Sequence, residues 1–279
     1  MIDNLRTLII DGLETAYYEA GAGPTVVLLH GGEHGANSEL AWEFNFGVLA
    51  EEFHVLAPDW LGFGKSAKVH DFVLGAQRRL LHLKRFLEEK RITKADFIGC
   101  SMGGAIVVRA LATDQSFIPA RSLTLIGAGG HAPDNQYRRA LLNYDCTVAG
   151  MRKVVEALFY EKFWPDNSAY VQRRFESSIS PGAWECSEAA RLKNPLLPQR
   201  SEFGQIDTTQ YERIICPVLV IGGQRDKLKD PSYGLELAKR FPDCEVQMIR
   251  DSGHYPNIER ASEVNEILLR FLRTVNEKG

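Results

Sequence analysis

Residues 95–111 read Ala-Asp-Phe-Ile-Gly-Cys-Ser-Met-Gly-Gly-Ala-Ile-Val-Val-Arg-Ala-Leu. An apolar, strand-like run leads into Gly99-Cys100-Ser101-Met102-Gly103, and a helix-like run follows from Gly104. Gly-x-Ser-x-Gly between a strand and a helix is the pattern of a nucleophile elbow, a sharp turn that lifts the serine hydroxyl clear of a sheet. Glycine is expected on both sides because this strained turn brings strand and helix too close for side chains. Ser101 is therefore the candidate nucleophile.

The rest of the chain supplies the pattern of an α/β protein. Short apolar runs bounded by turn residues predict strands of a sheet covered on both faces. Between these runs, longer segments with helical periodicity predict helices, and alternation of the two favours a mainly parallel, doubly wound sheet. The predicted strands lie at 6–10 and 14–19, which form a hairpin around Asp11-Gly12, and at 25–29, 53–57, 95–98, 122–126, 217–221 and 245–249; the predicted helices lie at 71–90, 104–111, 231–240 and 259–275.

One segment departs from this alternation. From His131 to Asp207 the sequence is rich in helix formers and aromatic residues and lacks apolar strand runs, and Pro165, Pro181, Pro195 and Pro198 break it into pieces. We interpret it as a helical lid inserted into the sheet domain. The predicted organisation is a first core part at 1–130, a lid at 131–207 and a second core part at 208–279.

Size, charge and cysteine content narrow the function classes. A chain of 279 residues fits one large α/β domain or two small ones, and a net charge of −3 gives no reason to expect nucleic acid or an anionic membrane as a partner. Neither a signal peptide nor an apolar window near the roughly 20 residues of a membrane helix is seen. The five cysteines lack metal-site spacing and predict no disulfide framework, which favours a cytoplasmic protein without a bound metal; they are Cys100, Cys146, Cys186, Cys216 and Cys244.

A serine nucleophile needs a base and an acid. Of seven histidines, His254 follows directly on the last predicted strand, where a loop can deliver an imidazole to Ser101. Asp226 follows the preceding strand and completes the chain order Ser, Asp, His. A carboxylate in that place fixes the tautomer of the base and stabilises the imidazolium. Asp251 is an alternative acid, but it lies only three residues before His254 and more readily caps its own loop.

The negative charge that develops on a substrate oxygen needs N–H donors. Met102 follows the nucleophile and offers its backbone N–H at the start of the elbow helix, where the helix dipole favours an anion. The second donor is expected in the glycine loop His30-Gly31-Gly32-Glu33-His34-Gly35, after the strand at 25–29, and Gly32 is our choice. Gly32 and Met102 together are the predicted oxyanion hole.

With these residues in place, the chain resembles the serine α/β-hydrolases. Serine at the elbow, rather than a carboxylate, argues against a dehalogenase or an epoxide hydrolase. The motifs that carry the resemblance are His30-Gly31-Gly32, Asp59-Trp60-Leu61-Gly62-Phe63-Gly64-Lys65-Ser66, Gly99 to Gly104, Asp226 and Gly253-His254.

A finer resemblance is to the meta-cleavage product hydrolases, which split a carbon–carbon bond in 2-hydroxy-6-oxo-hexa-2,4-dienoates. Ser101-Met102-Gly103-Gly104, Gly127-Ala128-Gly129-Gly130 and the lid segment Val171 to Glu176 are similar to that family. The resemblance implies that Arg174 binds the substrate carboxylate, and a guanidinium can grip such a group with two charge-assisted bonds. We also expect Gly31 and Tyr255 to contact the substrate.

Three positions depart from that family. Cys100 stands where asparagine is frequent, Tyr255 where tryptophan is common, and Glu33-His34-Gly35 where the loop usually continues Gly-Pro-Gly. These differences keep a carboxylesterase or lactonase with the same triad as the alternative. A ligand receptor without catalysis on this fold is a hypothesis of another class, which the complete triad disfavours.

The predicted reaction needs no cofactor. The resemblance implies ketonisation of the dienoate in the site, attack by Ser101 and release of the acyl group by water that His254 activates. The expected partner is a small molecule that carries a carboxylate, and the family resemblance leaves a homo-oligomer open.

Overall fold

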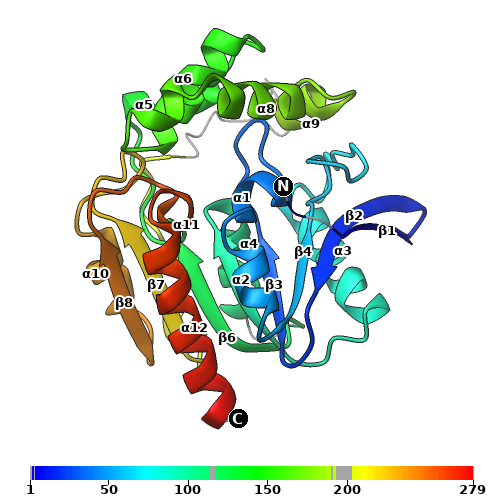
Figure 1. Ribbon diagram of the computed structural model, residues 1–279, viewed down its shortest axis with the longest axis vertical. Helices are drawn as coiled ribbons and strands as arrows, with labels where there is room; N and C mark the ends of the chain where they lie inside the picture. Colours follow the sequence, from blue (N-terminus) through cyan, green and yellow to red (C-terminus); the bar gives the residue numbers. More distant parts are fainter. Residues whose placement is uncertain (1, 3, 114–116, 190, 193–202, 279) are drawn as a thin grey trace.

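The computed structural model describes residues 2, 4–113, 117–189, 191–192 and 203–278. Its strands form one sheet in the order β1-β2-β4-β3-β5-β6-β7-β8 (Figure 1). β2 pairs antiparallel with both of its neighbours, β1 and β4, and all other neighbouring strands are parallel. The strands are β1 Leu5–Ile10, β2 Leu13–Ala20, β3 Thr25–Leu29, β4 His54–Pro58, β5 Ala95–Cys100, β6 Ala120–Ile126, β7 Val218–Gly223 and β8 Cys244–Ile249. The predicted fold class, a mainly parallel sheet with helices and a helical insertion, is confirmed.

The opening hairpin follows from its turn residues. Ile10 pairs with Leu13 across a two-residue turn of Asp11 and Gly12, both of which have positive φ angles (50° and 77°). A two-residue turn with two positive φ angles matches the twist of the adjoining strands, and Asp-Gly is among the sequences that adopt it most readily.

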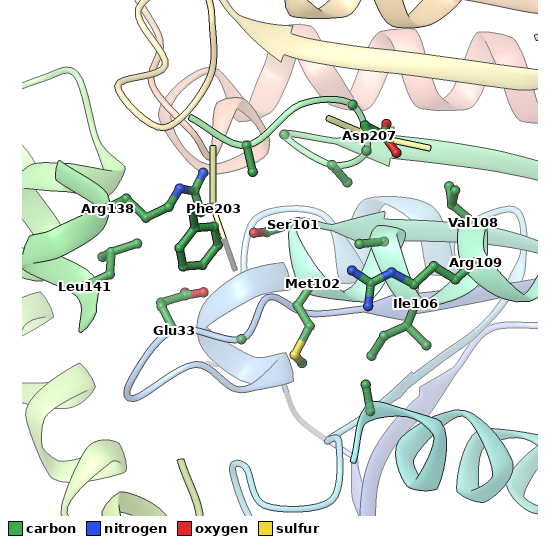
Figure 2. A pocket seen from close by; sticks show the side chains of 18 of the residues that line it. Glu33, Ser101, Met102, Ile106, Val108, Arg109, Arg138, Leu141, Phe203 and Asp207 are labelled. Carbon is green, nitrogen blue, oxygen red and sulfur yellow. The ribbon is translucent and has the colours of Figure 1, made fainter. Parts of the chain in front are cut away.

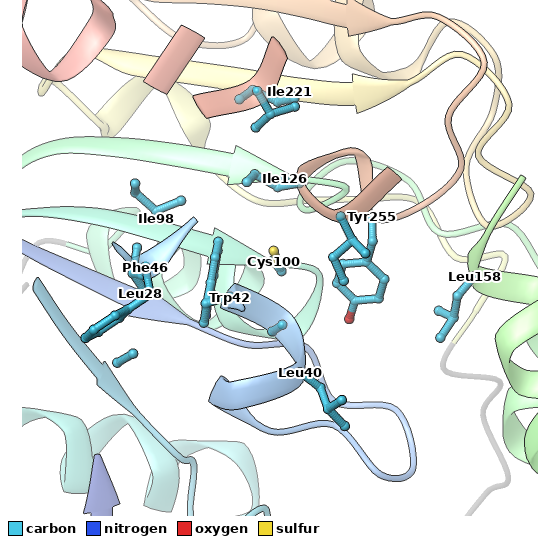
Figure 3. Close-up of a cluster of buried hydrophobic side chains, with 14 of the residues drawn as sticks. Leu28, Leu40, Trp42, Phe46, Ile98, Cys100, Ile126, Leu158, Ile221 and Tyr255 are labelled. Atoms are coloured by element: carbon cyan, nitrogen blue, oxygen red, sulfur yellow. The ribbon is translucent and has the colours of Figure 1, made fainter. Parts of the chain in front are cut away.

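Two apolar clusters cover the two faces of the sheet. Side chains alternate along β3, so that Val26 and Leu28 belong to one cluster while Val27 and Leu29 belong to the other. The first cluster, part of which Figure 3 shows, includes residues of α1 (Ser38–Trp42), α2 (Phe46–Ala50), α11 (Pro256–Glu259) and α12 (Ala261–Lys278). The second includes residues of α3 (Ala76–Glu89), α4 (Met102–Leu111) and α10 (Tyr233–Ala238). Burial on both faces explains why the central strands are almost wholly apolar.

In its described residues, the helical insertion contains the five α-helices α5 to α9 between β6 and β7, drawn in green at one end of the sheet in Figure 1. Side chains at their N-termini fix several starts, because Asn135, Thr147 and Asn167 each accept a hydrogen bond from a backbone N–H of the helix that follows. The helices are α5 Gln136–Leu142, α6 Val148–Leu158, α7 Phe163–Asp166, α8 Ser168–Ser178 and α9 Ala183–Ala189. The boundaries of the lid at 131 and 207 stay a prediction, and part of that segment lies outside the described residues.

Some helices differ from the sequence-based expectation. The helix predicted from Asp71 begins at Ala76, because the Asp71 carboxylate accepts hydrogen bonds from the N–H groups of Val73 and Leu74 and holds a turn there. Helices α1 and α2 were not predicted, since five residues are too few to display a helical period. Among the described helices, none is long and apolar enough to cross a membrane.

Candidate active site

Ser101 lies at the sharp turn between β5 and α4. Its φ of +46° and ψ of −114° are uncommon for a residue with a side chain, and such strain persists where surrounding structure fixes it. A Cβ atom on Gly99 would overlap the backbone of Gly104, and one on Gly103 would overlap the Leu29 carbonyl of β3. The glycines beside Ser101 are therefore required by the close approach of helix and strands.

His254 and Asp226 form a buried hydrogen-bonded pair. The His254 Nδ1 atom lies 2.7 Å from the Asp226 Oδ2 atom, and both side chains are 2% exposed. A carboxylate at Nδ1 places the proton on that nitrogen and leaves the lone pair on Nε2. His254 Nε2 is buried and has no hydrogen-bond partner among the described residues, so no bond to Ser101 is formed there. Nε2 is thus the nitrogen that could accept a proton from a serine hydroxyl. Hydrogen bonds of this kind often shorten only when substrate binds.

The loop that carries His254 is attached to the helical insertion. The His254 N–H donates to the Leu158 carbonyl, at the end of α6, over 2.7 Å. The buried Glu259 carboxylate accepts from the Gly253 N–H on one oxygen and from the N–H groups of Tyr160 and Glu161 on the other. One side chain therefore joins the loop to the segment between α6 and α7. Asp251, the alternative acid, is exposed and does not bond to His254 in the described structure.

The glycine loop after β3 lies against Met102. A Cβ atom on Gly32 would overlap the Met102 side chain, so the two predicted oxyanion donors come from adjacent segments. The loop is held by His30, whose Nδ1 lies 2.7 Å from the Gly31 carbonyl and whose Nε2 accepts from the Trp60 N–H. Burial lowers the pKa of His30, which keeps the imidazole neutral. Met102 opens α4, and the first N–H groups of a helix have no partner within it.

A cavity of about 400 Å³ opens over Ser101 (Figure 2). Gly32, Ser101 and Met102 all line it, together with Glu33 and residues of the helical insertion. This volume is in the range of small-molecule sites. Its other described lining residues include Phe63, Arg79, Arg109, Gly127 to Gly130, Arg138, Leu141, Arg191, Phe203, Asp207, Tyr211 and Lys229.

Arg174, the predicted carboxylate ligand, is engaged by a carboxylate of the chain itself. It lies on α8, is 2% exposed, and its Nη2 atom is 2.6 Å from Glu33 Oε1. The Tyr255 hydroxyl donates to the other oxygen of Glu33 over 2.7 Å, and a Cβ atom on Gly31 would overlap both Tyr255 and Glu33. Although burial alone would raise it, the Arg174 guanidinium holds the pKa of Glu33 below its usual value.

The three predicted substrate contacts therefore surround Glu33. Arg174, Tyr255 and Gly31 are not among the described residues that line the cavity, whereas Glu33 is. A substrate carboxylate that bound Arg174 Nη2 would compete with Glu33 for that atom. The role of Arg174 as a carboxylate ligand stays a prediction.

Comparison with known proteins gives the family. Residues 24–261 match the family model described as alpha/beta hydrolase fold. The chain belongs to the alpha/beta hydrolase family.

Proteins similar to this hydrolase are named for more specific activities. It is 32% identical over 266 residues to the 2-hydroxy-6-oxo-6-(2'-aminophenyl)hexa-2,4-dienoic acid hydrolase of Metapseudomonas resinovorans, which covers 94% of this chain and 88% of that one. It is 28% identical to the 2-hydroxymuconate semialdehyde hydrolase of Pseudomonas sp. (strain CF600), over 96% and 93% of the two chains. A solved serine hydrolase involved in carbazole degradation superposes with a TM-score of 0.81 at 27% identity, over 97% and 98% of the chains. The protein is thus a hydrolase of the α/β fold similar to meta-cleavage product hydrolases.

Cys100, which departs from the pattern of those hydrolases, lies away from the cavity in this hydrolase. Its side chain is fully buried in the first apolar cluster (Figure 3), with Sγ 3.7 Å from Asn257 Oδ1. Burial raises the pKa of the thiol well above its usual value, so the sulfur stays protonated and is no second nucleophile.

Sequence reasoning gave no site role to the charged residues of the hydrolase that line the cavity, which are Glu33, Arg79, Arg109, Arg138, Arg191, Asp207 and Lys229. An acid directly after the predicted oxyanion glycine was a local signal for Glu33. A lysine three residues after Asp226 was the corresponding signal for Lys229, but nothing local marks Arg138. Among the described residues, no cluster of three or more histidine, cysteine or acidic side chains could hold a metal ion.

Proposed function

We propose that this hydrolase cleaves a carbon–carbon bond in a dienoate of the 2-hydroxy-6-oxo-hexa-2,4-dienoate class, with Ser101, His254 and Asp226 as its triad. The observation that supports the substrate class is the likeness, over nearly the full chain, to hydrolases named for such compounds. The buried His254–Asp226 pair and the strained turn at Ser101 support the chemistry.

In the proposed reaction, His254 Nε2 takes the proton of Ser101 while Oγ bonds to the keto carbon of the ketonised substrate. The N–H groups of Gly32 and Met102 hold the resulting oxyanion, and a donor of this kind contributes about 3 kcal/mol. The bond to the neighbouring carbon then breaks, and its electron pair leaves with the dienol fragment, which receives the proton from His254. Water, deprotonated by Nε2, attacks the acyl-serine and releases a carboxylic acid.

Hydrolysis of a neutral ester or lactone is the second candidate. Glu33 favours it, because this carboxylate already neutralises Arg174 and itself faces the cavity. A substrate carboxylate placed beside Glu33 would meet a like charge. The same triad would act on an ester without change, with an alcohol as the leaving group.

A turnover panel distinguishes the two. The protein is mixed with coloured meta-cleavage dienoates that differ in their 6-substituent, and with p-nitrophenyl esters of short neutral acids. Carbon–carbon cleavage predicts loss of the dienolate colour and higher kcat/KM for at least one dienoate than for every ester. Turnover of esters alone would establish the second candidate.

The role of Ser101 is tested separately. A fluorophosphonate should label the protein once per chain, and Ser101→Ala should abolish both labelling and turnover. Persistent turnover by a folded Ser101→Ala variant, or failure of the wild type to label, would contradict the triad.

A further inference from the structure

Two cationic side chains, Arg138 and Lys229, line the cavity beside the loop after β7 that carries Asp226, here called the acid loop. Lys229 lies three residues after Asp226, and Arg138 lies on α5 of the helical insertion. The guanidinium of Arg138 lies over the Phe203 ring (Figure 2), and its Cζ atom is 4.5 Å from the ring centroid. Neither cation belongs to the triad or to the predicted oxyanion hole.

Neutral backbone carbonyls hold both cations in place. Lys229 Nζ donates to the carbonyls of Gly129 and His131. Arg138 donates from Nε to the Pro133 carbonyl and from Nη2 to the Leu228 carbonyl over 2.7 Å. These bonds fix the side chains without placing a carboxylate in contact with either cation, and Arg138 Nη1 has no hydrogen-bond partner among the described residues.

The carboxylates around the two cations are committed elsewhere. Asp226 bonds to His254, Asp207 forms an ion pair with Arg240, Asp230 bonds to His131, and Asp134 forms an ion pair with Arg139. Within the described part of the chain, no carboxylate lies within ion-pair distance of Arg138 or Lys229. A half-buried pair of cations that faces a cavity without a counter-ion is a site for an anion.

The two cations lie across Ser101 from the Glu33–Arg174 pair. Glu33 follows β3 and Lys229 follows β7, and in the sheet β3 and β7 stand on opposite sides of β5, which carries Ser101. One end of the cavity therefore holds a carboxylate of the chain itself, whereas at the other end Arg138 and Lys229 have no carboxylate of the described residues within ion-pair distance.

We propose that Arg138 and Lys229 form the subsite for the substrate's carboxylate, so that the substrate is anchored on the acid-loop side of Ser101 rather than at Arg174. The ligand class is a small molecule with a carboxylate a few bonds from a reactive carbonyl. This proposal rests on the proposed function in taking Ser101 as the reacting residue, and it holds equally for carbon–carbon and ester cleavage.

Two esters of matched length test the subsite. The p-nitrophenyl monoester of glutarate carries a carboxylate, whereas p-nitrophenyl valerate does not. Their kcat/KM ratio, anionic over neutral, should fall roughly tenfold or more in Lys229→Met and in Arg138→Met, the loss expected for a charge-assisted bond. Lys229→Arg should recover most of the ratio. The control Arg139→Met removes a neighbouring arginine that pairs with Asp134 at the surface, and it should leave the ratio unchanged.

Equilibrium binding provides a readout that does not depend on turnover. Glutarate is titrated calorimetrically into the Ser101→Ala variant, alone and combined with Lys229→Met, Arg138→Met or Arg174→Met. Loss of affinity with the first two and not with the third supports the subsite. Loss with Arg174→Met alone, or equal effects of Lys229→Met on both esters, overturns it.

The same titration separates this inference from the proposed function. If the wild type cleaves neither dienoates nor esters, the proposed function fails. Glutarate binding that depends on Lys229 would still support the anion subsite in that case, and glutarate binding that is absent or independent of Lys229 would overturn it.

Discussion

Glu33 Oε1 lies 2.6 Å from Arg174 Nη2, and both side chains are buried beside the cavity that Ser101 lines. The two residues are far apart in the chain, one in the glycine loop and the other on α8 of the insertion. Their pairing means that the protein supplies the anion for the arginine that sequence resemblance assigned to the substrate. The site therefore differs from the sequence-based prediction in the partner of Arg174, which is Glu33 rather than a substrate carboxylate.

Glu33→Gln should therefore cost stability and change substrate preference. Because the substitution leaves the buried Arg174 charge without its partner, we expect the free energy of unfolding to fall by about 3–5 kcal/mol. Removal of the carboxylate should also raise the anionic-over-neutral ester ratio, since a like charge is lost from the cavity. Urea denaturation and the ester pair measure the two effects.

The matched control is Glu43→Gln, because Glu43 pairs with the partly exposed Arg173 at 2.9 Å. That pair lies closer to solvent and should contribute only a small part of a buried pair's energy. Equal stability losses in the two variants would contradict a special role for the Glu33–Arg174 pair.

Asp226→Asn should lower kcat by about 10⁴-fold, because an amide at His254 Nδ1 no longer fixes the productive tautomer. The substitution is nearly isosteric, so the KM of a neutral ester should change little. The comparison is Asp251→Asn, which alters the exposed alternative acid and should retain the kcat of the wild type. The opposite order of the two losses would assign the acid to Asp251.

Carboxylate binding should weaken as the pH rises through about 8. Burial lowers the pKa of Lys229 to about 8, with Asp226, Asp207 and Asp230 acting to raise it and Arg138 to lower it. Lysine binds an anion only when protonated, so glutarate affinity in Ser101→Ala should be full below this pKa and decline above it. A bound carboxylate raises the pKa, which moves the decline to higher pH at saturating glutarate.

Lys229→Arg is the control for this titration, because a guanidinium stays charged across that range. It should bind glutarate with little change across the range in which Lys229 loses its proton, because the pKa of arginine lies far above that range. An identical pH profile in both proteins would show that another group causes the decline.

His82 should make the fold less stable in mild acid. Its Nε2 atom lies 2.7 Å from Thr15 Oγ1 inside the protein, and burial lowers its pKa from 6.5 to about 4. Between these values the unfolded chain binds more protons than the native one, so the free energy of unfolding falls as the pH is lowered. His82→Gln should reduce this fall, measured by urea denaturation at several pH values, and a fall of unchanged size would contradict the assignment to His82.

The parts that could be predicted from sequence are those that local physics determines. The hairpin follows from Asp11-Gly12, the central strands from their wholly apolar runs, and the turn at Ser101 from its glycines. The residues Asp226 and His254 could be chosen because each directly follows a strand, and parallel strands bring their carboxyl ends to one edge.

The charged lining of the cavity could not be predicted in this way. Glu33 meets Arg174 only because α8 packs over the glycine loop, and Arg138 meets the Leu228 carbonyl only because α5 packs against the acid loop. Such contacts depend on how the insertion is placed on the sheet. The residue pattern within one segment does not predict how the insertion packs on the sheet.

Glu259 has a consequence for exchange of the insertion between related hydrolases. Its carboxylate joins the Gly253 N–H of the histidine loop to the Tyr160 and Glu161 N–H groups of the insertion, and the Leu158 carbonyl accepts from His254 itself. A graft cut only at the two junctions with the sheet would separate these partners. When the insertion is exchanged to alter substrate specificity, residues 253–259 therefore have to be transferred together with it.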